Sequence, residues 1–246
     1  MSINHIKYIL GNIPIFWINL EKSVRRRTIM NDFLKNHNIL ATRLNAVDGD
    51  NINIDEYKQN YTINEKMSKY EIACAMSHLN IIKHCYDNHL EYALILEDDA
   101  MFDYLEYHTL TMCDLINLLH KKNGDCIQLC NVINRKYFNT FVNNSNILKR
   151  GSLAGASAYL ITLTGMEKVL NNFNNNKHIE VSEHMIFNKL NNYIVNPYFT
   201  YPFLRDNDGN KVNLSFIRLN TKGAHATQTI SKQLWDNYYK NNKKII

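Results

Sequence analysis

The chain has 246 residues, of which 45% are hydrophobic and 21% charged, so it can bury one sizeable core. The formal net charge of +5 is modest, and the basic residues are dispersed except at 25–27 and 240–244, so the dense basic stripe of a nucleic-acid-binding protein is absent from the sequence. No stretch approaches the roughly 18 consecutive apolar residues of a membrane span. Polar residues also interrupt the N-terminal segment where a signal peptide would be apolar, so we expect a cytoplasmic protein with reduced cysteines.

The first predicted unit is a strand, a turn and a helix. Residues 13–20 form a run of β-branched and aromatic residues that is typical of a buried strand. Ser23 is a candidate helix N-cap, and apolar residues recur at helical spacing over 23–37. The chain therefore opens with a strand that leads directly into a helix.

A second strand and the clearest helix follow. Residues 43–47 are typical of a short strand, which the turn dipeptide at 48–49 closes. Residues 68–71 form a Ser-x-x-Glu capping box, and the apolar residues after it keep to one face. We expect this helix to run to about Asn88.

Strands and helices continue to alternate after this helix. We expect strands at 92–96, 126–130 and 156–161, and helices at 166–173 and 183–190. Such alternation predicts an α/β fold in which helices cover both faces of a mostly parallel sheet. The chain contains no repeat or linker that would split it, so we expect a single domain over 1–246.

Three consecutive acids, Glu97, Asp98 and Asp99, end the strand at 92–96. Ligands of open α/β sheets bind outside the carboxyl ends of the strands. Adjacent carboxylates repel one another, and a divalent cation would offset that repulsion; oxygen ligands suit Mg²⁺ or Mn²⁺. The alternative is an exposed acidic turn without a ligand.

Four sequence blocks occur in the order and rough spacing of one family. They are Ile18-Asn19-Leu20 with Ser23, Arg26 and Arg27; Ala46 to Gly49; Glu71 to His78; and Leu94 to Phe102. A later block of small residues, Gly155 to Thr162 with Gly165 and Leu170, also fits. Over about residues 13–201 the sequence resembles glycosyltransferase family 25, the lipooligosaccharide galactosyltransferases, which also resemble the glycosyltransferase domains of collagen-modifying enzymes.

The resemblance implies a GT-A-type, Rossmann-like sheet and an inverting transfer of a hexose. UDP-galactose or UDP-glucose is the usual donor in such a family, and the acceptor is a saccharide or a glycosylated molecule. We expect a donor-binding half at about 13–130, an acceptor and catalytic half at about 131–230, and a basic amphipathic tail at 231–246.

The expected donor site centres on a metal ion. Asp99, helped by Asp98, would hold a divalent cation that bridges the two phosphates of UDP, with Mn²⁺ preferred over Mg²⁺. Glu97 would face the ribose or the strand backbone. Arg26 lies in the first turn of the helix at 23–37, where an anion is favoured, so it would contact the diphosphate or uridine; a solvated arginine is the alternative.

Other candidate donor contacts have equally strong structural alternatives. Asn19 would hydrogen-bond the uracil or satisfy a turn, and Asp48 would contact the donor or only build its turn. His78 would contact the donor or be a satisfied core histidine. His225, late in the chain, is a further candidate metal ligand, because some GT-A enzymes use a late histidine in that role.

An inverting transfer needs a general base for the acceptor hydroxyl. The resemblance places an acid at 178–183, where Glu180 fits better than Glu183, since Glu183 is expected to begin a helix. The Asp-rich segment 206–209 lacks the glutamate of a calcium loop and is expected to be a turn. Loops at 134–146 and 198–213 would select the acceptor.

The C-terminal tail allows two interpretations. Trp and Tyr residues recur at helical spacing from 231 and lysines follow, which favours a helix packed on the domain; the alternative is peripheral contact with an anionic membrane. Two rival functions also stay open: a non-catalytic scaffold of glycosyltransferase type, and another nucleotide-dependent transferase. The second would need a Gly-rich phosphate loop, and residues 20–27 contain no glycine.

Overall fold

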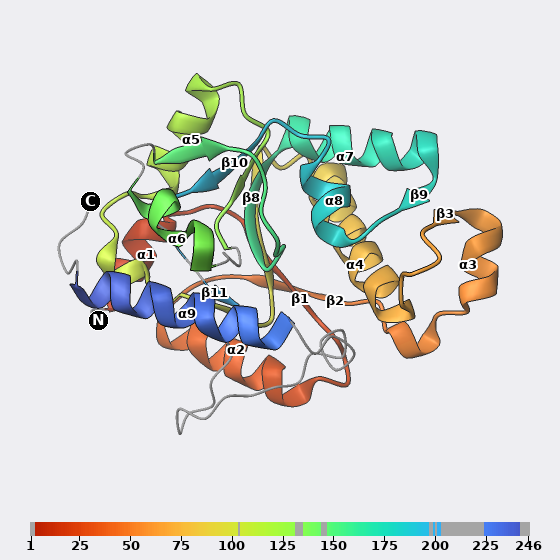
Figure 1. The fold of residues 1–246 in the computed structure, drawn as a ribbon, viewed down its shortest axis with the longest axis horizontal. Coiled ribbons are helices and arrows are strands. Elements are labelled where there is room, and N and C mark those ends of the chain that lie inside the picture. Colours follow the sequence, from red (N-terminus) through yellow and green to blue (C-terminus); the bar gives the residue numbers. More distant parts are fainter. Residues whose placement is uncertain are drawn as a thin grey trace.

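The computed structural model describes residues 3–102, 104–130, 135–143, 147–196, 199, 201–202 and 224–241. Strands from both expected halves of the chain join in one seven-stranded sheet (Figure 1). In spatial order the strands are β2 (Thr42–Asn45), β1 (Ile15–Asn19), β4 (Tyr92–Glu97), β8 (Ala158–Thr162), β6 (Cys126–Gln128), β10 (Asn192–Val195) and β7 (Leu148–Arg150). Five of them point the same way, whereas β8 and β7 run antiparallel to their neighbours. The predicted mostly parallel sheet is confirmed.

Helices cover both faces because the apolar strand residues alternate between them. Trp17 and Leu96 share one core cluster, and the adjacent residues Ile18 and Ile95 share another. The first face is covered by α1 (Ile3–Leu10), α2 (Val24–Asn36) and α5 (Met112–Lys121). The second is covered by α4 (Lys69–Asp87), α7 (Leu163–Asn176) and α8 (Ser182–Phe187). This layering is consistent with a Rossmann-like, GT-A-type fold.

The described chain also contains several smaller elements. They are the helix α3 (Ile54–Asn60), the 3-10 helices η1 (Gly49–Asn51) and η2 (Leu105–Tyr107), and two short ladders, β3 (Thr62–Ile63) with β9 (His178–Ile179) and β5 (Ala100–Met101) with β11 (Tyr201–Pro202). No helix in these described parts is both long and apolar enough to cross a membrane.

Local capping explains where the main helices begin. Ser68 and Glu71 form the predicted capping box at the start of α4. The α7 helix starts three residues earlier than predicted, because the Thr162 side chain accepts a hydrogen bond from the Gly165 backbone N–H. A Cβ atom on Gly165 would lie 2.7 Å from the Asp125 carbonyl oxygen, so glycine allows the helix to approach β6 closely.

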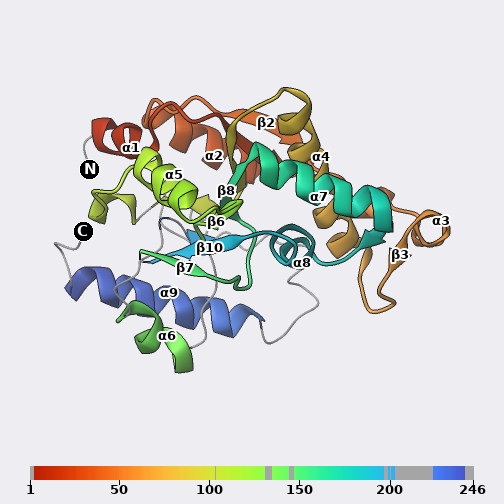
Figure 2. The same cartoon turned by 90° about the horizontal axis from the view of Figure 1, so that it is seen from above.

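The C-terminal helix α9 (Ala224–Asn241) packs beside α6 (Arg135–Val142) (Figure 2). The exposed fraction is 0% for Trp235 and 2% for Tyr239, and the Trp235 ring meets the Phe138 ring edge-on at 4.9 Å. The face of α9 that carries Trp235 and Tyr239 is therefore buried in the protein, as the packed-helix interpretation expects. In the alternative interpretation this face would contact the membrane.

Replacing Trp235 with alanine is expected to lower the free energy of unfolding by about 3–5 kcal/mol, because it empties a fully buried aromatic site. Urea unfolding followed by circular dichroism measures this loss. The matched control is Lys240→Ala on the same helix, which should change stability by no more than about 0.5 kcal/mol. Equal midpoints for the parent and the Trp235 variant would contradict the packing of α9.

Candidate active site

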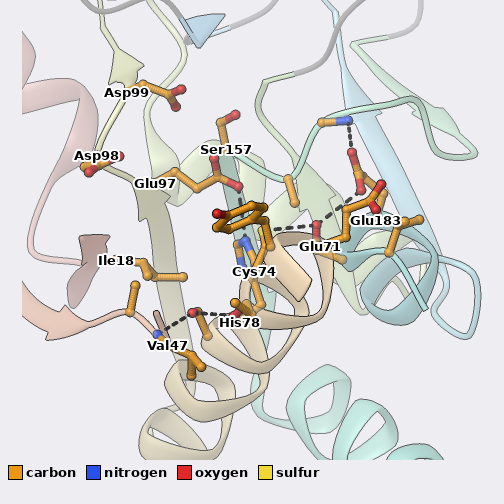
Figure 3. A pocket seen from close by; sticks show the side chains of 18 of the residues that line it. Ile18, Val47, Glu71, Cys74, His78, Glu97, Asp98, Asp99, Ser157 and Glu183 are labelled. Carbon is orange, nitrogen blue, oxygen red and sulfur yellow. Dashed lines mark hydrogen bonds and ion pairs between the residues drawn. The ribbon is translucent and has the colours of Figure 1, made fainter. Parts of the chain in front are cut away.

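A cavity of about 710 Å³ opens at one edge of the sheet, where β1 and β4 end and β8 begins (Figure 3). Because β8 runs antiparallel to β4, its first residues reach the same edge as the carboxyl ends of those two strands. The N-terminal halves of α2, α4 and α8 supply further walls. The cavity thus occupies the position where open α/β sheets bind ligands.

The acidic run after β4 gathers around Arg26 at one end of this cavity. A guanidinium nitrogen of Arg26 pairs with Oδ1 of Asp98 and lies 3.2 Å from Oδ2 of Asp99. Asn19 donates to Oδ2 of Asp98 at 2.6 Å, and Arg43 donates to the Asn19 side-chain oxygen at 3.2 Å. Exposed fractions of 12% for the Arg26 side chain and 9–10% for the two aspartates show that this is a buried ionic cluster. An exposed acidic turn and a solvated arginine are therefore not what the structure contains.

The succession of β1 and α2 along the chain explains how this cluster forms. The β1 strand ends at Asn19, and α2 begins at Val24, so Arg26 lies in the first turn of a helix that starts beside the end of β4. The Arg26 side chain then reaches the acids that follow β4. The positive end of the α2 dipole favours negative charge at the same place.

Burial sets the charge balance of the cluster. Burial raises the pKa of Asp98 to about 6, although the Arg26 charge lowers it and the charge of Asp99 raises it further. Burial would lower the pKa of Arg26, but the charges of Asp98 and Asp99 outweigh it and raise that pKa. The cluster thus brings two carboxylates together beside one guanidinium, and carboxylate oxygens are the ligands that a hard divalent cation prefers.

His78 ties α4 to the end of β4. Its ring is fully buried; Nδ1 lies 3.0 Å from the Tyr159 hydroxyl and Nε2 lies 3.2 Å from Oε1 of Glu97. Glu97 therefore faces His78, not only the strand backbone. His78 is thus a buried histidine with both ring nitrogens satisfied, as one of the two interpretations expects, and it also lines the cavity.

The opposite wall carries Glu183. Figure 3 shows Glu183 across the cavity from Asp98 and Asp99, with Glu97 between them. The Gly155 backbone N–H donates to Oε1 of Glu183 at 3.0 Å, and Ser182 donates to Oε2 at 3.2 Å. These two contacts fix a carboxylate on the cavity wall.

Gln128 holds the loop that presents Gly155. Its side-chain amide donates to the Leu153 carbonyl at 2.7 Å and to the Gly155 carbonyl at 2.5 Å, and its oxygen accepts from the Leu153 N–H at 3.0 Å. Gln128 is fully buried in β6. The sheet therefore fixes the loop that carries the hydrogen-bond donor to Glu183.

Two predicted site residues lie outside the described lining of the cavity. Asp48 caps η1 by accepting from the Asp50 N–H and pairs with Lys22 at 2.7 Å, as expected of a turn-building residue. Glu180, the favoured base, sits between β9 and α8 and is also not part of that lining.

Some predictions fall where the structure gives no side-chain description. His225 is in α9, but its side chain is outside the described residues. The same holds for the segment 206–209, for most of 198–213, and for parts of 134–146.

Sequence reasoning missed cavity residues that looked purely structural. Glu71 is expected only as a helix-capping residue and Cys74 only as one of the reduced cysteines, yet both line the cavity. Tyr159 lies within the buried strand β8, and its hydroxyl forms a hydrogen bond with a ring nitrogen of His78. The spacing of Cys74 and His78, four residues apart on one helix, was the signal that could have placed the cysteine beside the histidine.

The family model of glycosyltransferase family 25 (LPS biosynthesis protein) matches residues 12–185, well over half of the chain. The chain belongs to glycosyltransferase family 25. The family 25 region includes β1, β4, β8 and the first residues of α8, and hence the described lining of the cavity except Asn188. Family membership supports a glycosyltransferase, the enzyme class that the sequence motifs predict.

Curated relatives include procollagen galactosyltransferase 2 of Mus musculus and of Homo sapiens. Each is 30% identical to this family 25 chain over 106 residues. The matches cover 39% of this chain but 17% of each relative's length.

Proposed function

We propose that this protein is an inverting hexosyltransferase that moves galactose or glucose from a UDP-sugar to a saccharide or glycosylated acceptor. The observation that carries the proposal is the arrangement of the cavity. A buried cluster of two aspartates and an arginine lies at one end, and a fixed carboxylate lies on the opposite wall. An inverting displacement needs groups that stabilise the leaving diphosphate on one side of the sugar and a base for the incoming hydroxyl on the other side.

Asp99 is our proposed principal ligand for a divalent cation, with Mn²⁺ preferred over Mg²⁺. Carboxylate oxygens are the donors these ions prefer, and the cluster holds the carboxylates of Asp98 and Asp99 together beside Arg26. Arg26 and Asn19 already engage the two oxygens of Asp98, so Asp98 fits the role of orienting the cluster beside Asp99. When bound, the cation would supply Lewis-acid stabilisation of the departing diphosphate.

Arg26 would share the task of binding the diphosphate. Its guanidinium is held in place by Asp98 and Asp99, so it needs little reorganisation to meet a phosphate. Asn19 keeps Asp98 oriented through its side-chain amide. These residues bind and orient the leaving group from the protein side.

Glu183 is our proposed general base. Sequence reasoning favoured Glu180, but Glu183 is the one of the two that lines the cavity. Its carboxylate would accept the proton of the acceptor hydroxyl as the hydroxyl oxygen bonds to the anomeric carbon. The bond from that carbon to the diphosphate breaks in the same step, on the opposite face of the sugar.

A panel of nucleotides tests the donor. UDP at about 100 times its dissociation constant should stabilise the protein by about 2.7 kcal/mol, which corresponds to roughly 5–10 °C in melting temperature for a chain of this size. We expect that shift with UDP and Mn²⁺, a much smaller shift with UDP and EDTA, and none with GDP or CMP. Hydrolysis of UDP-galactose or UDP-glucose should show the same metal dependence. It is measured as the amount of UDP released. A UDP shift without any hydrolysis or transfer would support the scaffold alternative, and a larger shift with GDP or CMP would contradict the donor.

A further inference from the structure

Three different ligand atoms meet on the floor of the cavity beside the aspartate cluster. They are the Cys74 sulfur and a His78 ring nitrogen from α4, and a Glu97 carboxylate oxygen from the end of β4. All three lie within 4.8 Å of one another. The Asp98 and Asp99 cluster offers oxygen only, whereas this set offers sulfur, nitrogen and oxygen.

The backbone explains why these atoms meet. Cys74 and His78 are four residues apart, so they project from the same face of α4 one turn from each other. That face packs toward the sheet, and β4 ends there with Glu97. Two side chains at i and i+4 on a helix, completed by an acid from another element, form a common arrangement of zinc ligands.

The spacing is close to what a tetrahedral ion requires. Zn²⁺ bonds are about 2.3 Å to sulfur and about 2.0–2.2 Å to nitrogen or oxygen, which places neighbouring ligand atoms roughly 3.3–3.8 Å apart. The His78 nitrogen and the Glu97 oxygen are already 3.2 Å apart. The Cys74 sulfur lies within 4.8 Å of both atoms, so a small movement of its side chain would complete the set.

Hydrogen bonds behind the cluster also suit a metal site. The second ring nitrogen of His78 lies 3.0 Å from the hydroxyl of the fully buried Tyr159, a partner that fixes the ring orientation. The Cys74 thiol contacts the Ser182 hydroxyl at 3.8 Å. All three ligand residues line the cavity, so a fourth position would face the open space.

We propose that Cys74, His78 and Glu97 bind a thiophilic divalent cation such as Zn²⁺, at a site separate from the Asp99 site. As the ion bonds to the Cys74 sulfur, the thiol proton is released to solvent. The bound ion links the middle of α4 to the end of β4. Mn²⁺ and Mg²⁺ prefer oxygen ligands and would bind the aspartates instead.

Cobalt substitution tests the site directly in the full chain. Co²⁺ added to metal-free protein should produce the near-ultraviolet thiolate-to-cobalt charge-transfer band, and Zn²⁺ should bleach it because Zn²⁺ binds more tightly. Cys74→Ser should abolish the band and weaken Zn²⁺ binding, measured by calorimetry, at least about 10-fold. The matched control is Cys113→Ser, which removes an exposed thiol on α5 and should leave both signals unchanged.

Two further variants separate this proposal from the donor proposal and from misfolding. Asp99→Asn should retain the cobalt band even where it loses the Mn²⁺-dependent UDP shift. Cys74→Ala is a second variant without the sulfur, and circular dichroism and the melting temperature show whether it is folded. If it is folded and lacks the band, a folding defect does not explain the loss in the serine variant. The proposal is overturned if the parent protein gives no charge-transfer band, or if the band survives in a folded Cys74 variant.

Discussion

Asp99→Asn is expected to lower the rate of sugar transfer by about 10²–10³-fold or more and to abolish the Mn²⁺-dependent part of the UDP melting shift. The asparagine keeps the volume of the side chain but removes the charge that a cation needs. Asp99 is buried beside Arg26 at the end of the cavity where the donor diphosphate is proposed to bind. Initial rates with UDP-galactose and UDP-glucose, and melting curves with Mn²⁺ or EDTA, measure the two effects.

Asp87→Asn is the matched control for this change. Asp87 makes a solvent-exposed ion pair with Lys83 at the far end of α4, so its loss should alter neither the rate nor the UDP shift. A folded Asp99→Asn protein that binds UDP and Mn²⁺ as tightly as the parent would remove Asp99 from the metal site. The cation would then have to be held elsewhere.

Glu183→Gln should reduce kcat by about 10²–10⁴-fold while leaving UDP affinity nearly unchanged. The amide keeps the hydrogen bond from the Gly155 N–H, because its carbonyl oxygen can still accept, but it cannot take the acceptor proton. Single-turnover rates separate this chemical effect from donor binding.

The neighbouring acid provides the comparison for this test. Glu180→Gln makes the same chemical change three residues earlier, outside the described lining of the cavity, and should leave kcat within about twofold of the parent. If Glu180→Gln shows the large loss and Glu183→Gln does not, the assignment from the sequence was right and the one from the cavity is wrong. Equal small effects would place the base on another residue.

Local signals account for the parts of the fold that the sequence predicted well. The capping box at Ser68 and Glu71 defined α4, and the apolar run before Glu97 defined β4 with the acids at its end. Arg26 was expected at the start of a helix, and its pairing with Asp98 and Asp99 agrees with that position. These features depend on neighbours only a few residues away in the chain.

Features that depend on distant parts of the chain were harder to predict. The direction of β8 does not appear in its apolar pattern, because parallel and antiparallel buried strands have the same composition. Glu183 is oriented by a hydrogen bond from the Gly155 N–H, and Gly155 lies in a loop that Gln128 holds by hydrogen bonds of its own. The helix α5 is not among the predicted helices, although Thr111 and Asp114 form a capping box at its start and give a local signal for it.

The position of β8 also governs the order in which the sheet can assemble. It lies between β4 and β6, although about 30 residues separate it from β6 and about 60 from β4 along the chain. The other neighbour of β6, β10, comes later still, so β6 emerges from the ribosome before either strand that flanks it. During synthesis β1, β2 and β4 can pair among themselves, while β4 keeps an open edge until residue 162 has been made. An exposed strand edge can pair with the wrong strand, so the growing chain is most prone to mispairing while the edge of β4 is open. At that stage the cavity has the walls that β1, β4 and α4 provide but lacks those that β8 and α8 provide.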